Sequence, residues 1–301
     1  MMQLAPIVLF TYNRPVHTRQ TIDALLRNEY ASGSDLIIFS DAPKSDEVGD
    51  GVRQTRAYLR GITGFRSINL IERAENMGLA ANIIDGVTQV VNEYGRIIVL
   101  EDDLLTSPYF LKFMNEALTM YEQVEEVISV HGYVFPIKKK LPESFFIRGA
   151  DCLGWGTWKR GWDLFTPNGA KLLNDIKARK LKWTFDFSGS YPFAKMLKMQ
   201  TEGSVSSWAV RWYASALLKD KLTLYPGRSL IFHNGSDGSG TNYSGDNALD
   251  VKLFDRPIVL ERLLPKEDIN ARKAFIGYFR YAMLWHKIRY RIKCVFQARK
   301  G

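Results

Sequence analysis

The sequence predicts an α/β fold with a mostly parallel central sheet and helices on both of its faces. In the first 130 residues, short apolar runs alternate with polar or amphipathic segments of helical length. This alternation is typical of βαβ units, whose strands pair in parallel. The runs are also nearly continuous in apolar residues, which is typical of strands covered on both faces. A chain of 301 residues with 46% hydrophobic and 24% charged residues is large enough to bury such a core.

The predicted elements follow one another along the chain. Short apolar runs predict strands at Pro6–Phe10, Leu36–Phe39, Ser67–Ile71, Arg96–Leu100 and Val127–Val130. Between them, the pattern predicts helices over roughly 15–28, 46–60, 79–94 and 107–123. Later elements are a helix over 170–182, a helix that opens at Ser207 and a strand at Leu222–Tyr225. No linker or internal repeat precedes residue 233, so we expect one domain over 1–255.

Polar side chains follow each predicted strand, and the most informative are three consecutive acids, Glu101, Asp102 and Asp103. In sheets of this kind, ligands bind beyond the carboxyl ends of the strands. Three adjacent carboxylates repel one another unless a cation or a helix N-terminus compensates their charge. Mg²⁺ and Mn²⁺ prefer carboxylate and phosphate oxygens, so the triplet predicts a Mn²⁺ or Mg²⁺ site beside a diphosphate. The alternative is a group of acids that caps the following helix.

Six segments spread in order over residues 8–245 carry a resemblance to a known class of enzyme. They are Val8–Arg14, Ser40-Asp41, Glu75–Leu79, Val99–Asp103, Leu153–Trp158 and Asp237–Thr241. With them the chain resembles the metal-dependent nucleotide-sugar glycosyltransferases of the Rossmann-like GT-A fold. Within that class it is most similar to a bacterial surface-polysaccharide group, which is distantly similar to the Golgi N-acetylglucosaminyltransferase that initiates complex N-glycans. The resemblance implies a nucleotide-sugar half over 1–130 and an acceptor half with a lid loop over 131–255.

The resemblance also implies roles for the residues at the strand ends. The residues implied for contacts with the base, ribose and diphosphate are Thr11, Asn13, Arg14, Asp41, Arg73, Asn76 and Gly78. Glu101 and Asp102 would contact the donor sugar and the ribose, and Asp103 would be the main metal ligand. For the residues outside the acidic triplet, ordinary loop and capping chemistry is the alternative.

Two later segments suggest further contacts. Trp155, between two glycines, is the expected sugar-stacking residue, because aromatic faces pack on the apolar face of a pyranose. The alternative is burial in the core, which we expect for Trp162 and Trp212. The glycine-rich loop over 233–245 is predicted to close over the donor and exclude water, as the matching region does in the resembled enzymes. His233 would reach the metal or diphosphate, or be structural.

The catalytic base is the least determined part of the predicted site. An inverting transfer needs a carboxylate or similar base near the acceptor hydroxyl. In the resembled Golgi enzyme an aspartate precedes a tryptophan at a helix start, but the corresponding stretch here is Ser206-Ser207-Trp208. The candidates that remain are Asp237 in the glycine-rich loop, then Asp151, and Glu202.

The net charge of +9 comes entirely from the end of the chain. Of the 41 Lys and Arg residues, 9 lie in 269–301, where there is no acid, so the first 268 residues carry 32 cations and 32 anions. A neutral body argues against nucleic acid as a partner. Within the segment 256–301, Tyr281, Leu284, Ile288, Ile292 and Val295 share one face of a predicted helix. Such basic amphipathic helices bind anionic membrane surfaces, and docking of this face on the body is the alternative.

Together these features predict a metal-dependent glycosyltransferase with a nucleoside-diphosphate donor, expected to be a UDP-sugar, and a glycan or lipid-linked glycan acceptor. We expect a cytoplasmic protein, peripheral on the inner face of the cell membrane, that acts in surface polysaccharide biosynthesis. A nucleotidyltransferase is the second interpretation, although Thr11–Pro15 lacks the glycine run that such enzymes usually have. A non-catalytic donor-binding or scaffold subunit of a polysaccharide complex is the third, because the expected base is missing.

Overall fold

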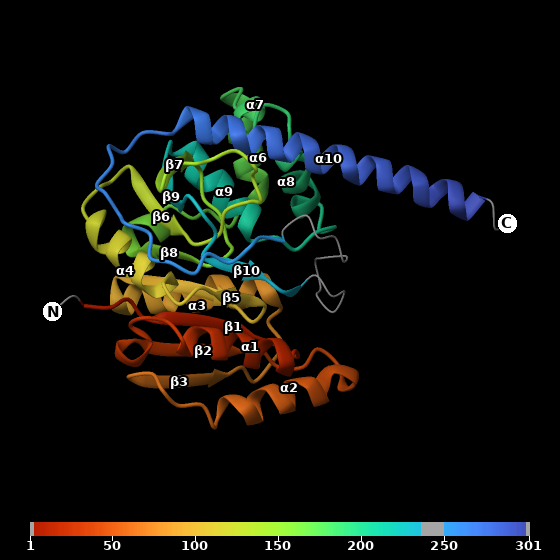
Figure 1. Ribbon diagram of the computed structural model, residues 1–301. Coiled ribbons are helices and arrows are strands. Elements are labelled where there is room, and N and C mark those ends of the chain that lie inside the picture. The colour runs from red at the N-terminus through yellow and green to blue at the C-terminus, as the bar shows by residue number, and fades with distance from the viewer. Residues whose placement is uncertain (1–2, 236–249, 299–301) are drawn as a thin grey trace.

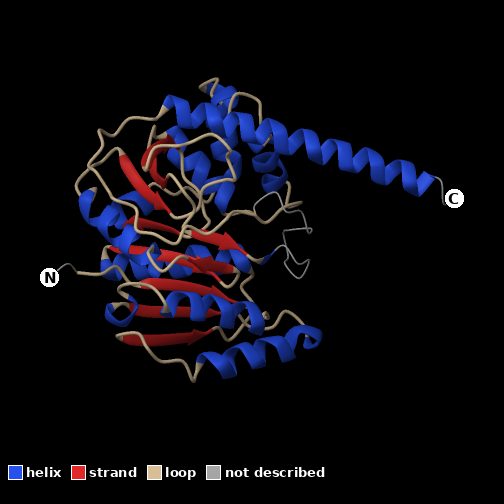
Figure 2. Ribbon diagram, viewed as in Figure 1, coloured by secondary structure: helices blue, strands red, loops and turns tan. Residues whose placement is uncertain are grey.

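The computed structural model describes residues 3–235 and 250–298, and side chains of the last helix as far as Leu284. Its main sheet has eight strands in the order β3-β2-β1-β4-β8-β6-β9-β7, and helices pack against it (Figures 1 and 2). A second sheet pairs β10 with β5. The predicted α/β fold with a mostly parallel central sheet is confirmed.

Four neighbouring parallel strands come from the first third of the chain. They are β1 (Ile7–Thr11), β2 (Asp35–Ser40), β3 (Ser67–Glu72) and β4 (Arg96–Glu101). Thr11 pairs with Ser40, Ser40 pairs with Glu72, and Glu101 lies opposite Phe10. The polar residues that follow these strands therefore meet at one edge of the sheet, as the sequence predicts.

The helices of this half begin and end at residues whose chemistry explains their limits. They are α1 (Pro15–Leu26), the 3₁₀ turn η1 (Ala31–Gly33), α2 (Asp46–Leu59) and α3 (Leu79–Tyr94). Pro15 occupies the first helical position, where its fixed φ is favourable and its missing N–H is not needed. Gly95 ends α3 in the left-handed conformation, with φ of 77°.

The second half of the sheet contains antiparallel strands that the sequence does not predict. Strand β8 (Trp155–Trp158) lies between β4 and β6 (Val127–His131) and runs antiparallel to both. Strand β9 (Leu222–Pro226) is parallel to β6, and β7 (Ser144–Arg148) is antiparallel to β9. The predicted strand over 127–130 is confirmed, but it is separated from β4 by a strand that comes later in the sequence.

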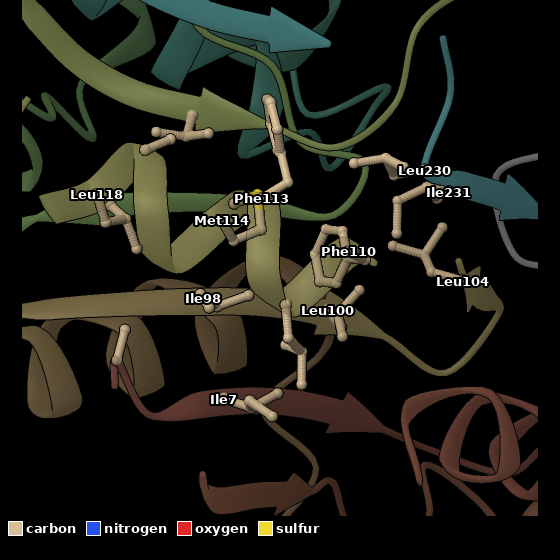
Figure 3. Close-up of a cluster of buried hydrophobic side chains, with 14 of the residues drawn as sticks. Ile7, Ile98, Leu100, Leu104, Phe110, Phe113, Met114, Leu118, Leu230 and Ile231 are labelled. Carbon is tan, nitrogen blue, oxygen red and sulfur yellow. The ribbon is translucent and has the colours of Figure 1, made fainter. Parts of the chain in front are cut away.

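The main core lies between the sheet and the helix α4 (Phe110–Met120). Phe110, Met114 and Leu118 point from α4 toward Ile98 of β4 and Ile7 of β1 (Figure 3). Beside them, β5 (Leu104–Thr106) pairs with β10 (Ile231–His233), which places Leu104 next to Ile231. The helix predicted over 107–123 is therefore shorter, because its first residues follow a strand and a turn.

Short helices cover the second half of the sheet. They are α5 (Lys159–Trp162), α6 (Gly169–Ala178), α7 (Lys182–Phe185), α8 (Phe193–Thr201) and α9 (Ala209–Leu218). Lys180, with φ of 56°, separates α6 from α7, so the helix predicted over 170–182 is divided in two. Ser207 accepts a hydrogen bond from Val210 N at 3.3 Å at the start of α9, near the predicted helix start.

The last helix, α10 (Ile269–Ala298), begins against this half of the sheet and extends away from it (Figure 1). Its Ala271, Phe275 and Phe279 are buried in the core formed with α6 to α9. Before it, Asp268 N donates to Phe146 O at 2.9 Å, which ties the preceding segment to β7. Packing thus continues across the predicted boundary at residue 255. Among the described helices, none is both long and apolar enough to cross a membrane.

Candidate functional site

The three acids lie at the carboxyl end of the central strand β4, where the chain turns into β5. Arg14, from the loop after β1, places its Nη1 2.8 Å from Asp103 Oδ2 and 3.7 Å from Asp102 Oδ1. In the same loop, Tyr12 N donates to Asp102 Oδ2 at 3.2 Å. The loops after β1 and β4, about 90 residues apart in sequence, therefore form one polar cluster.

A segment from the far end of the chain completes this cluster. Because β10 pairs with β5, His233 Nε2 lies 3.4 Å from Asp103 Oδ2, and Asn234 N donates to Asp103 O at 3.0 Å. Gly235 packs so closely that a Cβ there would lie 2.4 Å from Asp103 Oδ2 and 3.0 Å from Arg14 Nη2. The sequence suggests that His233 could reach this site. It does not predict β5 or β10, because strands of three residues give no recognisable periodicity.

The charges of the acids are strongly unequal. Burial raises the pKa of Glu101 to about 8, and the neighbouring Asp103 and Asp102 charges contribute to this rise. Burial and the Asp103 charge likewise raise the pKa of Asp102 to about 7. Burial opposes ionisation of Asp103 too, but its hydrogen bond with His233 and its contact with Arg14 outweigh that effect and lower its pKa. At neutral pH, Asp103 is thus the acid of the three that is fully ionised.

The carboxylates of this cluster are compatible with binding of a hard divalent cation. The described residues contain no group of three or more His, Cys, Asp or Glu side chains arranged around a metal position. Mg²⁺ typically takes one or two protein carboxylates and completes its shell with substrate phosphates and water. Asp103 and Asp102 already hold one positive group, the Arg14 guanidinium, between them. A carboxylate pair of this kind fits an ion that receives its other ligands from a diphosphate.

Two residues, one at the end of β1 and one in the loop after it, have buried polar atoms without a hydrogen-bond partner in the described part of the chain. They are the hydroxyl of Thr11 and the Nε and Nη2 atoms of Arg14. An unsatisfied buried polar group costs about 1–3 kcal/mol. Because both lie at the predicted base, ribose and diphosphate contacts, a nucleotide that hydrogen-bonds them would remove this cost.

Asp41 organises the loop that precedes α3. Its buried carboxylate accepts hydrogen bonds from Met77 N and Gly78 N, each at 2.9 Å, and from Asn76 Nδ2 at 3.3 Å. Gly78 has a φ of 73°, which favours glycine, and begins the helix. The structure therefore brings Asp41, Asn76 and Gly78 together, as predicted, but as one hydrogen-bonded unit. Their contact with a nucleotide stays a prediction.

Two arginines support the same edge of the sheet. Arg73 donates from Nε to Asn82 Oδ1 at 3.0 Å and lies 4.8 Å above the ring of Phe39. Arg56 of α2 donates from Nη2 to the carbonyl oxygens of Ser40, Asp41 and Arg73, at 2.8–3.2 Å. The sequence prediction omits Arg56, whose only signal is its position beside the buried face of an amphipathic helix.

The loop that contains Asn13 contacts α2 and the segment after β2. A Cβ at Gly51 of α2 would lie 2.6 Å from Asn13 O, so this loop rests directly on the helix. On the same side, Lys44 N donates to the Tyr12 hydroxyl at 3.0 Å. The loop is thus fixed by α2 and by the segment after β2 without any ligand.

The structure corrects the prediction for Trp155. Its side chain is 1% exposed and lies in β8, surrounded by the rings of Trp162, Trp208 and Trp212 at centroid distances of 5.5–5.9 Å. No face of its ring is open to a sugar. The neighbouring glycines serve packing instead, because a Cβ at Gly156 would lie 2.9 Å from Ile97 O. Trp162 and Trp212 are in the core, as expected.

Asp151 lies in the loop between β7 and β8, and its side chain is 26% exposed. Its Oδ1 accepts a hydrogen bond from Cys152 N at 2.9 Å, and its Oδ2 accepts one from the Tyr225 hydroxyl at 3.3 Å. Buried His131 accepts a hydrogen bond from Leu153 N at Nε2, so its proton is on Nδ1, which donates to Tyr133 O. Burial lowers the pKa of His131, although the Asp151 charge opposes this effect. A neutral imidazole therefore fixes the loop that carries Asp151.

The pKa of the Cys152 thiol responds to carboxylates from two loops. Its pKa is raised well above the ordinary value, first by burial and then by the charges of Asp151, Glu101 and Asp103. Carboxylates from the β7–β8 loop and from the end of β4 thus act on the same thiol.

The other candidate bases are placed differently. Asp237 and the loop predicted to close over the donor lie, from residue 236 on, outside the described residues. Glu202 is exposed after α8, and its Oε1 is 3.5 Å from Lys198 Nζ. Among the three candidates, Asp151 is the one whose charge, like the charges of Glu101 and Asp103, raises the pKa of the Cys152 thiol.

Part of the sequence matches a known protein family. Residues 7–130 match Glycosyl transferase family 2. The matched segment contains β1 to β4, the three acids and the loops that hold Arg14, Asp41 and Arg73. It covers less than half of the chain and supports a nucleotide-sugar glycosyltransferase domain. A search of curated proteins gives no match.

Solved structures match the chain at low similarity. TarS of S. aureus is 12% identical, with a TM-score of 0.34 over 49% of this chain and 25% of its own. The mannosyltransferase PcManGT of Pyrobaculum calidifontis, in complex with GDP-Man and Mn²⁺, is 14% identical, with a TM-score of 0.31 over 46% and 40%. A UDP-glucose pyrophosphorylase complexed with UDP-glucose is 13% identical, with a TM-score of 0.37 over 74% and 90%. This chain therefore spans less than half the length of either transferase.

Proposed function

We propose that the protein is a metal-dependent glycosyltransferase that moves a sugar from a nucleoside-diphosphate donor, a UDP-sugar, to a glycan or lipid-linked glycan. The observation that carries the proposal is the cluster at the end of β4, where ionised Asp103 meets Arg14 and His233. The family match over 7–130 supports donor chemistry at this edge. We further propose that the enzyme acts in bacterial surface-polysaccharide synthesis, as the resemblance to that group of glycosyltransferases implies.

In this proposal each residue has a defined task at the donor. Thr11, Asn13 and Arg14 hold the base, ribose and diphosphate, and Asp41 keeps the Asn76–Gly78 loop in place beside them. A bound Mn²⁺ or Mg²⁺, held by Asp103, would neutralise charge on the departing diphosphate. Arg14 contributes a fixed positive charge at the same place.

We propose Asp151 as the general base of an inverting transfer. Its carboxylate is partly exposed, is oriented by the Tyr225 hydroxyl and Cys152 N, and acts on the same thiol as Glu101 and Asp103. In that role it would remove the proton of the acceptor hydroxyl as the sugar–phosphate bond breaks. Asp237 remains the rival candidate.

A ligand-induced change in thermal stability tests the donor site. UDP and a panel of UDP-sugars should raise the melting temperature more with Mn²⁺ than with a chelator, because ligands that bind only the native state stabilise it. D103N should abolish the effect of Mn²⁺, whereas D163N, which removes an exposed carboxylate paired with Lys159, should not. Absence of a shift with every nucleotide would contradict the proposal.

Product analysis separates the transferase from its alternatives. A transferase should release UDP slowly from its donor in the absence of acceptor, and D151N should slow this release while leaving donor-induced stabilisation unchanged. Formation of UTP from UDP-sugar and pyrophosphate would identify a nucleotidyltransferase instead. Donor binding without any release of UDP would identify a scaffold subunit.

We also propose that α10 attaches the enzyme to the inner face of the cell membrane, beside a lipid-linked acceptor. The support is the charge of residues 269–301, which hold nine cations and no acid; seven of these cations lie in the helix α10 that extends past the body (Figure 1). Each cation near an anionic surface contributes about 1 kcal/mol to binding.

A further inference from the structure

Helix α10 docks with one face and exposes another. Ala271, Phe275 and Phe279, spaced by four residues, are at most 5% exposed and pack into the body. Tyr281 and Leu284 are 57% and 56% exposed. The apolar face predicted from the sequence therefore differs from the docking face, and the side chains of its first two members are more than half exposed. An outward apolar face flanked by cations is typical of a helix that lies on a membrane.

Three consecutive lysines of the body lie along one flank of this helix. Phe135 stacks on Tyr278 of α10 at 5.1 Å, and Ile137 and Leu141 pack against the same core as Phe275. Lys138–Lys140, between Ile137 and Leu141, are largely solvent-accessible. The loop thus docks on α10 with its apolar side chains and presents its charges outward. The sequence assigns the basic surface to the tail alone, but the structure adds three charges from the body.

An exposed tryptophan lies beside the other flank. Arg272 of α10 donates from Nη2 to Thr184 O at 2.9 Å, which joins α10 to α7. The neighbouring Trp183 is 65% exposed (α7 lies next to α10 in Figure 1). Arg272 and Tyr278 each lie three residues from Phe275, so at about 100° per residue they lie about 120° apart, on either side of the docking face. Tryptophan is enriched at membrane interfaces because its ring is apolar and its N–H is polar.

We propose that α10 and its two flanks form one surface that binds an anionic bilayer, so that the body and the helix attach together. This surface, called the α10 surface, consists of Lys138–Lys140, Trp183, Arg280, Tyr281 and Leu284. The inference rests on the proposed attachment of α10 and adds that the docked body takes part in it. Its consequence is a fixed orientation, because Phe275 and Phe279 join the helix rigidly to the sheet that carries the donor site.

Sedimentation with vesicles tests the proposal on the full chain. The protein should bind vesicles of phosphatidylglycerol and phosphatidylcholine, bind pure phosphatidylcholine poorly, and lose binding as salt rises. K138A/K139A/K140A should weaken partitioning by roughly a hundredfold, about fivefold for each charge lost. The matched control R53A/R60A/R66A loses three exposed charges around α2 and β3, away from α10 in Figure 1, and should bind like the unchanged protein.

Quenching by brominated lipid tests the tryptophan separately. Vesicles with brominated acyl chains should quench part of the protein fluorescence, and W183F should lose a share of that quenching. Because Trp183 is mostly exposed, this substitution should leave the melting temperature unchanged. A quenched fraction identical in the two proteins would overturn the placement of Trp183 at the bilayer.

The remaining outcomes distinguish this inference from the proposed membrane attachment and the proposed transferase activity. If removal of residues 285–301 abolishes binding but the triple-lysine variant binds normally, attachment belongs to the tail alone and the inference is wrong. If the full chain binds no anionic vesicles, membrane attachment itself fails. Lipid-free dimerisation that is lost in a Y281A/L284A variant would assign the α10 surface to a second copy and overturn the inference. Donor-induced stabilisation, measured in the same samples, tests the transferase activity independently.

Discussion

At the scale of single residues, the donor site depends on how Asp103 keeps its charge. Its carboxylate is surrounded by Arg14, His233 and the backbone at Gly235, while Glu101 and Asp102 have raised pKa values. A row of three acids thus behaves as one strong anion with two neighbours that accept protons easily. Protonation of Glu101 and Asp102 therefore reduces the repulsion among the three carboxylates that the sequence predicts.

Gly235→Ala should disturb this arrangement without unfolding the protein. A Cβ would lie 2.4 Å from Asp103 Oδ2, so the carboxylate must move, whereas the φ of Gly235 is not in the left-handed region. We expect at least tenfold weaker binding of UDP in the presence of Mn²⁺, measured by calorimetry, about 1.4 kcal/mol. Gly277→Ala is the control, because a Cβ added there would meet no atom within 4 Å. Equal affinity in both variants would show that Gly235 is not close to the bound ligand.

His131 should make the stability of the protein depend on pH. Its folded pKa is lowered by burial, so below the unfolded value of about 6.5 the unfolded state binds more protons. The contribution of neutral His131 is therefore present above about pH 6.5 and is lost as the pH falls. Because the raised pKa values of Glu101 and Asp102 give the opposite slope, the His131 contribution is measured as the difference between the unchanged protein and H131Q in urea unfolding. This difference should shrink as the pH falls from about 7.5 to about 5. The same slope in both proteins would assign the titration elsewhere.

The Tyr225 hydroxyl should matter for catalysis more than for folding. It donates to Asp151 Oδ2, so Y225F should slow release of UDP from the donor while leaving the affinity for UDP unchanged. Y213F removes another buried tyrosine hydrogen bond, to Phe185 O at 3.0 Å, and serves as the control for lost stability. A similar loss of rate in both variants would argue against a role for Asp151.

At the scale of elements, Arg56 of α2 joins the carboxyl ends of β2 and β3. It is 17% exposed and bonds to the carbonyl oxygens of Ser40, Asp41 and Arg73. R56A should therefore lower the free energy of unfolding by about 2–3 kcal/mol, since hydrogen bonds to charged groups are worth about 1.5–3 kcal/mol each and are not additive. R53A, on the exposed side of the same helix, should change it by less than about 0.5 kcal/mol. Equal effects in urea unfolding would contradict this assignment.

The parallel half of the sheet could be predicted from the sequence because its strands are continuous apolar runs separated by helices. That topology alone brings Arg14, Asp41 and Asp103 to one edge. Strand β8 could not be predicted, because Trp155–Trp158 is short, contains glycine and pairs with strands on both sides only after the rest of the sheet exists. The prediction for Trp155 is wrong for a related reason. Glycines beside an aromatic ring allow close packing in a core as well as approach to a ligand, and the sequence does not distinguish the two.

At the scale of the whole molecule, the last helix has two parts with different tasks. Removing 285–301 should leave the melting temperature and the affinity for UDP unchanged, whereas removing 269–301 should prevent folding. The second deletion takes away Phe275 and Phe279, and a buried Phe→Ala substitution alone costs about 3–5 kcal/mol. Expression and circular dichroism of the two truncated proteins check this difference. A folded protein ending at 268 would show that α10 is not needed for folding of the domain.

The pairing of β10 with β5 also determines when the proposed donor site can form. Asp103 depends on Arg14, 89 residues before it, and on His233, 130 residues after it. On the ribosome, the acidic turn emerges long before the strand that completes it, so the nascent chain has no finished site until nearly four fifths of it is made. The segment that matches the family could therefore not be transplanted with its binding properties intact. Late closure by a distant strand makes donor binding a reporter that the entire fold has been reached.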